Sequence, residues 1–130
     1  MKTKLLSLSL LFSAAFATLP LAQAAETSWA TEQMAKIVLH MENAPNADDR
    51  VALEDISMDS ASTIHEKALA DTLLKVDKKI RPADKKSIMR IWISPNASET
   101  ERSIAKALLK FDSTLDNKNR EILSQLVTTE

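Results

Sequence analysis

One residue pattern occurs three times along the chain, at a constant spacing of 35 residues. The recurring apolar columns are Met34/Leu69/Ile104, Val38/Leu73/Leu108, Leu53/Ile88/Leu123 and Ile56/Ile91/Leu126, with a small-residue column at Ala35/Ala70/Ala105. A period of this length is typical of helical hairpins that pack side by side, because a single hairpin cannot bury its apolar face alone. The pattern predicts an all-α fold of three 35-residue hairpins, and so six helices, forming a short solenoid or a compact bundle.

The composition favours the same fold class, because the chain contains no glycine at all. The tight turns of β-proteins need residues at positive φ, where glycine is the preferred residue. A helical chain without glycine must end its helices with other residues, and Asn and Pro are the expected substitutes.

Each copy begins with a residue that suits the N-cap of a helix: Ser28, Thr63 and Ser98. Glu66 and Glu101 stand three residues after the second and third of these, which is the spacing of a capping box. The first copy lacks this glutamate, so Ser28 is expected to act as a simple N-cap.

The apolar stripe of the first helix extends from Leu69 to Ile80 in the middle copy and predicts a helix of about four turns. A three-residue turn is expected to follow, with Asn46 and Asp116 as N-caps and Pro82 at a first helical position. The second helices are predicted at 47–57, 82–93 and 117–128.

The period is close to the 34 residues of tetratricopeptide repeats, and the Met34-Ala35, Leu69-Ala70 and Ile104-Ala105 pairs resemble the first helix of that family. The second helix departs from the family pattern, since Glu54, Met89 and Ser124 stand where small alanines are expected. The resemblance therefore covers one helix per repeat and implies stacked helical hairpins only.

The first 24 residues have the three parts of a secretory signal: basic Lys2 and Lys4, an apolar stretch at 5–16, and an A-x-A site that ends at Ala24. We expect cleavage there, which leaves one helical domain at 25–130 that contains the repeats 28–60, 63–95 and 98–130. The chain has no Cys, so neither a disulfide nor a lipid-bearing cysteine is expected. A small exported domain without disulfides indicates the bacterial periplasm. No second apolar stretch follows, so the domain is not expected to be embedded in a membrane, and a monomer or weak dimer is expected.

No arrangement of side chains predicts catalysis, a cofactor or a metal. A phosphate-binding loop needs glycine, and no serine stands in a nucleophile motif. The two imidazoles, His40 and His65, have no second ligand at metal-binding spacing. His40 shares its column with Lys75 and Lys110 and is expected to point into solvent.

Charge is unevenly distributed between the copies. Residues 29–60 carry two basic and seven acidic side chains, whereas residues 64–95 carry eight basic and four acidic ones. The basic cluster of the middle copy comprises Lys78, Lys79, Arg81, Lys85 and Lys86. Such a cluster either offsets the acidic first copy on a solvated surface or binds an anionic partner. Trp92 and Trp29 occupy variable positions of the repeat, which suits either binding anchors or half-buried edges of the core.

The leading hypothesis is an exported, non-catalytic repeat protein that binds a protein or peptide, with an acidic one favoured by the cluster, and no nucleic acid. One alternative is a periplasmic stress chaperone that holds unfolded clients. A second alternative is a small carrier of a metal or ligand.

Overall fold

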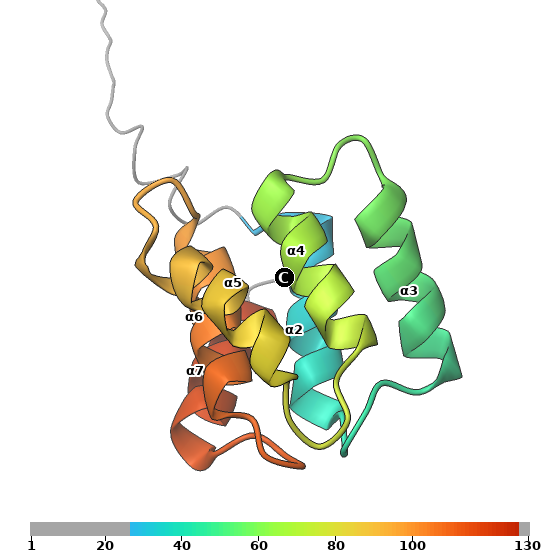
Figure 1. Cartoon of the computed structure of the whole chain (residues 1–130), viewed down its shortest axis with the longest axis vertical. Helices are drawn as coiled ribbons and strands as arrows, with labels where there is room; N and C mark the ends of the chain where they lie inside the picture. Colours follow the sequence, from blue (N-terminus) through green and yellow to red (C-terminus); the bar gives the residue numbers. More distant parts are fainter. Residues whose placement is uncertain (1–26, 128–130) are drawn as a thin grey trace, which may run out of the picture.

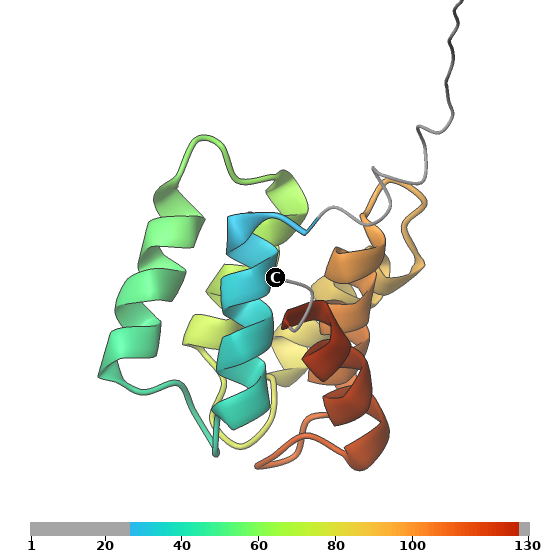
Figure 2. The same ribbon diagram turned by 180° about the vertical axis from the view of Figure 1, so that it is seen from behind.

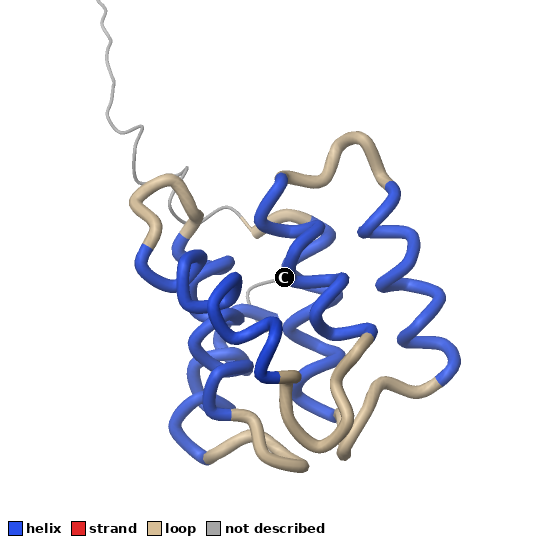
Figure 3. Tube along the Cα trace, in the orientation of Figure 1, coloured by secondary structure: helices blue, strands red, loops and turns tan. Residues whose placement is uncertain are grey.

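The computed structural model describes residues 27–127, and within this range the chain forms six helices and no strand (Figure 1, Figure 3). The helices are α2 (Trp29–His40), α3 (Ala47–Met58), α4 (Ile64–Leu74), α5 (Pro82–Ile93), α6 (Glu99–Lys110) and α7 (Asn117–Val127). The predicted all-α fold of three hairpins is confirmed. The predicted signal peptide at 1–24 lies outside the described residues. None of the described helices is both long enough and apolar enough to cross a lipid bilayer.

The three hairpins close into a ring. The first helices, α2, α4 and α6, contact one another in the middle of the bundle. The second helix of each hairpin packs mainly on the first helix of the next hairpin: α3 on α4, α5 on α6, and α7 back on α2 (Figure 1, Figure 2). Because the last helix returns to the first, the chain forms a closed bundle with approximate threefold symmetry rather than an open solenoid.

The repeated apolar columns form the core of this ring. Met34, Leu69 and Ile104 are fully buried, and so are Val38, Leu73 and Leu108. The alanine column is also fully buried, and its small side chains allow the inner helices to approach closely. The spacing of 35 residues thus places equivalent side chains around one shared axis.

Local capping residues set the starts of the helices, largely as predicted. The hydroxyl of Ser28 accepts a hydrogen bond from the Thr31 amide, while Thr63 and Ser98 form capping boxes with Glu66 and Glu101. The starts of the second helices also agree, because Arg81 makes no side-chain cap and Pro82 occupies the first turn of α5. An additional capping box joins Asn46 to Asp49.

The predicted length of the first helices was wrong. In the middle copy α4 ends at Leu74 instead of reaching Ile80, and a connecting segment at 75–81 replaces the expected three-residue turn. Val76 and Ile80 are nevertheless buried, with 2% and 4% of their surface exposed. The apolar period therefore continues into a segment that is not helical.

These helices end early because three connecting segments bond to one another at one end of the bundle. The Asn43 amide donates to the Ser113 carbonyl at 2.8 Å, the Lys78 amide to the Asn43 carbonyl at 2.6 Å, and the Ser113 amide to the Lys78 carbonyl at 2.6 Å. We call this cycle the turn ring. Asn43, Lys78 and Ser113 have positive φ, at 67°, 72° and 67°. Of the residues expected to replace glycine at helix ends, asparagine occupies one of these three positions. An amide that pairs across the ring cannot also continue a helix.

Replacing Lys78 by glycine is expected to leave stability unchanged or to raise it by up to about 1.6 kcal/mol. Glycine removes the cost of left-handed backbone, about 1–2 kcal/mol, but increases the entropy of the unfolded chain, which costs about 0.4–1 kcal/mol. Lys79→Gly is the matched control, because Lys79 is not among the residues with positive φ. Urea unfolding of both variants measures the difference, and a larger loss in Lys78→Gly than in Lys79→Gly contradicts this explanation.

Candidate functional site

The five cations of the basic cluster lie in the connection from α4 to α5 and in the first half of α5, and all five are exposed. Two of them have acidic neighbours, since the Lys79 ammonium lies 3.9 Å from Asp112 and Arg81 Nε lies 3.0 Å from Asp84. The hydrogen bond to Asp84 raises the pKa of the Arg81 guanidinium above its ordinary value. In the described part of the chain, the side chains of Lys78, Lys85 and Lys86 form no ion pair.

The structure adds cations from α6 to this cluster. Since α5 packs on α6, two hollows form at the opposite ends of this helix pair. The first, about 290 Å³, is lined by Lys79, Ile80, Lys85, Leu109, Lys110, Phe111 and Asp112. The second, about 190 Å³, is lined by Trp92, Glu99, Arg102, Ser103 and Lys106. We call the surface formed by Lys79, Lys85, Trp92, Arg102, Lys106 and Lys110 the basic face.

The basic face differs from its two equivalents in the other hairpins. The corresponding cations on α3 and α4 are Arg50, Lys67 and Lys75, with Asp71 where Lys106 stands. On α7 and α2 the corresponding cations are Arg120 and Lys36, with Glu32 where Arg102 stands. The equivalent positions of the α5–α6, α3–α4 and α7–α2 pairs therefore carry five, three and two cations.

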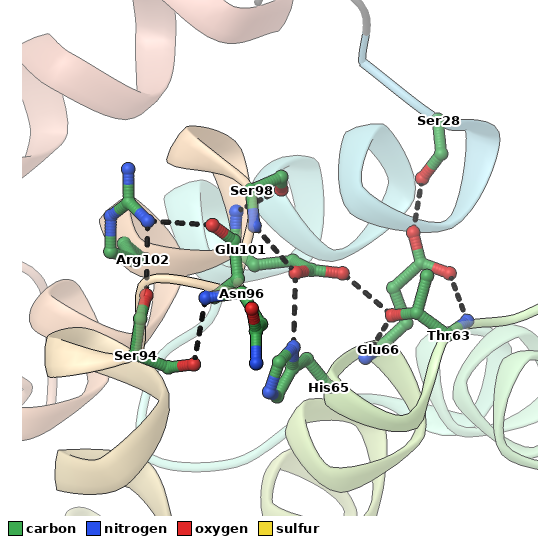
Figure 4. A network of polar contacts seen from close by, with 10 residues as sticks. Ser28, Thr63, His65, Glu66, Ser94, Asn96, Ser98, Glu101 and Arg102 are labelled. Carbon is green, nitrogen blue, oxygen red and sulfur yellow. Dashed lines mark hydrogen bonds and ion pairs between the residues drawn. The ribbon is translucent and has the colours of Figure 1, made fainter.

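The contribution of α6 to the basic face was not predicted from the sequence. Arg102, Lys106 and Lys110 follow one another at intervals of four residues, which places them on one side of a helix. The interval of four residues shows that the three cations share one side of α6. It does not show that they lie near the basic cluster, because that depends on the packing of α5 on α6. Arg102 also has a structural role, since its guanidinium donates to the Ser94 carbonyl at 3.1 Å and to the Ala97 carbonyl at 2.6 Å (Figure 4).

The two tryptophans lie in different parts of the structure. Trp92 is 38% exposed and lines the hollow beside Arg102 and Lys106. Trp29 is 54% exposed and begins α2, directly after the N-cap Ser28. Trp92 therefore belongs to the basic face, and Trp29 does not.

The opposite end of the bundle holds a second polar cluster, built from the N-caps of the first helices. Its hydroxyl groups bond to glutamates of the following hairpin (Figure 4). The Ser28 hydroxyl donates to Glu66 Oε2 at 2.5 Å, and the Thr63 hydroxyl donates to Glu101 Oε2 at 2.6 Å. Each glutamate also accepts its own N-cap amide through Oε1, at 2.8 Å. We call these contacts the cap ring, and they join the first hairpin to the second and the second to the third.

The cap ring borders a pocket of about 420 Å³, but the oxygens of its two glutamates already accept hydrogen bonds. The pocket is lined by Thr27, Ser28, Thr31, Thr63, Glu66, Ser98 and Glu101. Glu66 and Glu101 are only 4% and 3% exposed, and both oxygens of each accept hydrogen bonds. The third place of the ring holds Thr31, whose hydroxyl donates to the Ser28 carbonyl at 3.1 Å. The bonding of both glutamates is explained by their role in joining consecutive hairpins.

Both histidines contact carboxylates. His40 is 54% exposed, yet its Nε2 lies 2.9 Å from Asp49 Oδ2, so the expectation that it simply points into solvent was incomplete. His65 Nδ1 lies 3.4 Å from Glu101 Oε1, at the edge of the cap ring. Between residues 27 and 127 there is no group of three or more His, Cys, Asp and Glu side chains that could hold a metal ion.

Comparison with known proteins found no matching family model, curated protein or solved structure. The choice between the two polar clusters therefore depends on their geometry. The glutamates of the cap ring are buried and both oxygens of each accept hydrogen bonds, whereas Lys79, Lys85, Trp92 and Lys110 of the basic face are exposed and its charge is only partly neutralised. The basic face is the better candidate for a functional surface.

Proposed function

We propose that this protein is an exported, non-catalytic binding module that holds an acidic protein or peptide on the basic face. The observation that carries the proposal is the difference between the three equivalent helix pairs. The α3–α4 and α7–α2 pairs close the ring with fewer cations, so the fold does not require the five cations of the basic face. Concentrating like charges costs stability, and binding an anionic partner is a physical reason to retain them.

The form of the basic face supports an extended protein ligand. Lys85 and Lys110 lie at one end of the helix pair, and Arg102 and Lys106 at the other. A ligand with acidic groups spaced along a segment would contact both ends. Trp92 borders the second hollow with 38% of its surface exposed, and a partly exposed aromatic ring next to cations is a common anchor in protein interfaces.

The expected export of the chain also favours a protein ligand over nucleic acid. A signal peptide at 1–24 would direct the protein to the periplasm, where proteins and peptides are the more abundant polyanionic partners. Exposed ion pairs contribute mainly to the association rate and to specificity. Binding is therefore expected to weaken as salt is raised from about 50 mM to 0.5 M, because the Debye length falls below the distance between exposed charges.

The test reverses three charges on the basic face and compares this variant with one that reverses three charges of the α3–α4 helix pair. The variant Lys85→Glu/Lys106→Glu/Lys110→Glu is expected to lose at least about tenfold in affinity, at about 1 kcal/mol or less per exposed pair. Arg50→Glu/Lys67→Glu/Lys75→Glu is the control, since it makes the same change in net charge on α3 and α4. Each protein is immobilised in its mature form, and partners captured from periplasmic extract are identified and then titrated in solution.

The proposal predicts one stoichiometric partner for the wild type and the control, and none for the basic-face variant. Equal loss in both variants would show that net charge, and not this surface, controls binding. Circular dichroism checks that the variants are folded. If the basic-face variant unfolds while the control does not, the cations instead balance the acidic first hairpin.

A chaperone that holds unfolded clients is the second candidate. It is favoured by the exposure of Met58, Ile64 and Ile93, which are 79%, 79% and 68% exposed. Such side chains are able to bind apolar segments of many proteins. This function predicts many captured clients and suppressed aggregation of a denatured test protein, and both effects would persist in the basic-face variant.

A further inference from the structure

Helix α3 presents an apolar and acidic stripe that no other described element covers. Val51 and Met58 are 59% and 79% exposed. They are seven residues apart and so lie on one side of the helix, with Glu54 and Asp55 between them. Both acidic residues are exposed, and neither forms an ion pair with another residue of the 27–127 range. We call these four residues the α3 stripe.

Helix α5 presents a stripe of opposite charge at the equivalent positions. Adding the repeat length of 35 to the α3 stripe gives Lys86, Met89, Arg90 and Ile93. Met89 and Ile93 are 42% and 68% exposed, and Lys86 and Arg90 are exposed cations. We call these residues the α5 stripe. It is separate from the basic face, which uses Lys85 and Trp92 on the side of α5 that borders α6.

The third outer helix has no such stripe. Its equivalent positions within the described range are Glu121, Ser124 and Gln125. None of these side chains is a large apolar one, and α7 contributes no exposed large hydrophobic residue. Exposed apolar groups of this size therefore occur on two of the three outer helices, and these two carry opposite charges.

We propose that the α3 stripe of one copy of this chain packs on the α5 stripe of a second copy. Each stripe combines two exposed apolar side chains with two charges, and the charges of the two stripes are complementary. Contact would bury apolar surface, and would place Glu54 and Asp55 near Lys86 and Arg90. Complementary charge also disfavours pairing of two α3 stripes or two α5 stripes, because like charges would then face each other.

The position of the stripes determines the kind of assembly. The threefold arrangement of the ring places α3 and α5 on different sides of the bundle (Figure 1). A contact between two different surfaces leaves one free stripe on each partner, so it generates a ring or an open chain of copies instead of a twofold dimer. The assembly is expected to be weak and to dissociate in high salt, because its charges are exposed.

Sedimentation velocity of the mature protein tests the proposal, at about 10 µM to 1 mM, a range suited to weak association. The wild type is expected to sediment faster as concentration rises, beyond the value for a dimer, and to become monomeric in about 0.5 M salt. Lys86→Glu/Arg90→Glu and Glu54→Lys/Asp55→Lys are each expected to remain monomeric. The fourfold variant that carries all these changes exchanges the two charges and is expected to associate again. Glu121→Lys on α7 is the control and should behave as the wild type does.

Three results would overturn the proposal. One is a wild type that stays monomeric throughout, and binding of that protein to vesicles of anionic phosphatidylglycerol through the α5 stripe would then assign the stripe to a membrane surface, as for an interfacial helix. The second is a fourfold variant that is folded but fails to associate, and the third is equal loss of association in Glu121→Lys. Should a charge variant fail to fold, Met89→Ser/Ile93→Ser tests the same stripe, and wild-type association in that variant would also overturn the proposal. The basic-face variant is expected to associate normally, so this outcome is independent of the proposed function.

Discussion

Leu108→Ala is expected to lower the free energy of unfolding by about 2–5 kcal/mol, through lost burial and the cavity that remains. Leu108 is fully buried on α6, in the same column as Leu73 and Val38 on the other inner helices. Domains of this size are stabilised by only about 5–15 kcal/mol in total. The change therefore removes a large share of the stability, and urea unfolding followed by circular dichroism measures it.

Ile64→Ala is the control for this prediction. Ile64 is 79% exposed, so its truncation should change stability by no more than about 0.5 kcal/mol. Leu108→Ala should lower the free energy of unfolding several times as much as Ile64→Ala does. A Leu108→Ala protein as stable as Ile64→Ala would show that the three hairpins do not share a core.

The second large effect is expected for Glu101→Ala, at about 2–4 kcal/mol. Glu101 is 3% exposed and accepts the Ser98 amide at 2.8 Å and the Thr63 hydroxyl at 2.6 Å. Its removal deprives α6 of a capping partner, which costs about 1 kcal/mol, and leaves the Thr63 hydroxyl of a part-buried hydrogen bond without its acceptor, at about 1–3 kcal/mol. The variant therefore weakens both the start of α6 and the contact between the second and third hairpins. Thermal unfolding of the variant measures the combined cost.

Two further variants separate these contributions. Glu99→Ala removes an exposed acid from the same turn of α6 and should cost less than about 0.5 kcal/mol. Glu101→Gln keeps a side chain that is suited to a capping box, and so should cost less than Glu101→Ala. A Glu101→Ala variant no less stable than Glu99→Ala would contradict the structural role of the cap ring.

Local chemistry made much of the fold predictable. The capping of α4 depends on Thr63 and Glu66, which are three residues apart, and the start of α5 depends on Pro82. The helix ends were less predictable, because Val76 and Ile80 continue the apolar period beyond Leu74. There the distant amides and carbonyls of the turn ring override the period, and their pairing leaves no mark in the adjacent sequence.

Part of the candidate site was predictable from the local sequence, and part depends on contacts between repeats. The cluster from Lys78 to Lys86 is local, so its charge was visible in the sequence. Arg102, Lys106 and Lys110 join it only because α5 packs on α6, which is a contact between consecutive repeats. The glutamates of the capping boxes at Thr63 and Ser98 were recognised for their own helices, but the second bond of each, to a hydroxyl of the preceding hairpin, requires that consecutive hairpins pack together. The sequence of one repeat therefore predicts its own caps and charges, but not the contacts that it makes with the other repeats.

The turn ring makes the three hairpins equivalent in their contacts, whatever their order along the chain. Its three hydrogen bonds run from each hairpin to the next and back to the first, so no hairpin occupies an end. Three separate copies of one hairpin could make the same cycle as a cyclic trimer. Likewise, a circular permutant that begins at Thr63 and passes through a linker from Val127 to Ser28 would retain every contact of the ring. The contacts of the turn ring therefore do not depend on which hairpin comes first along the chain.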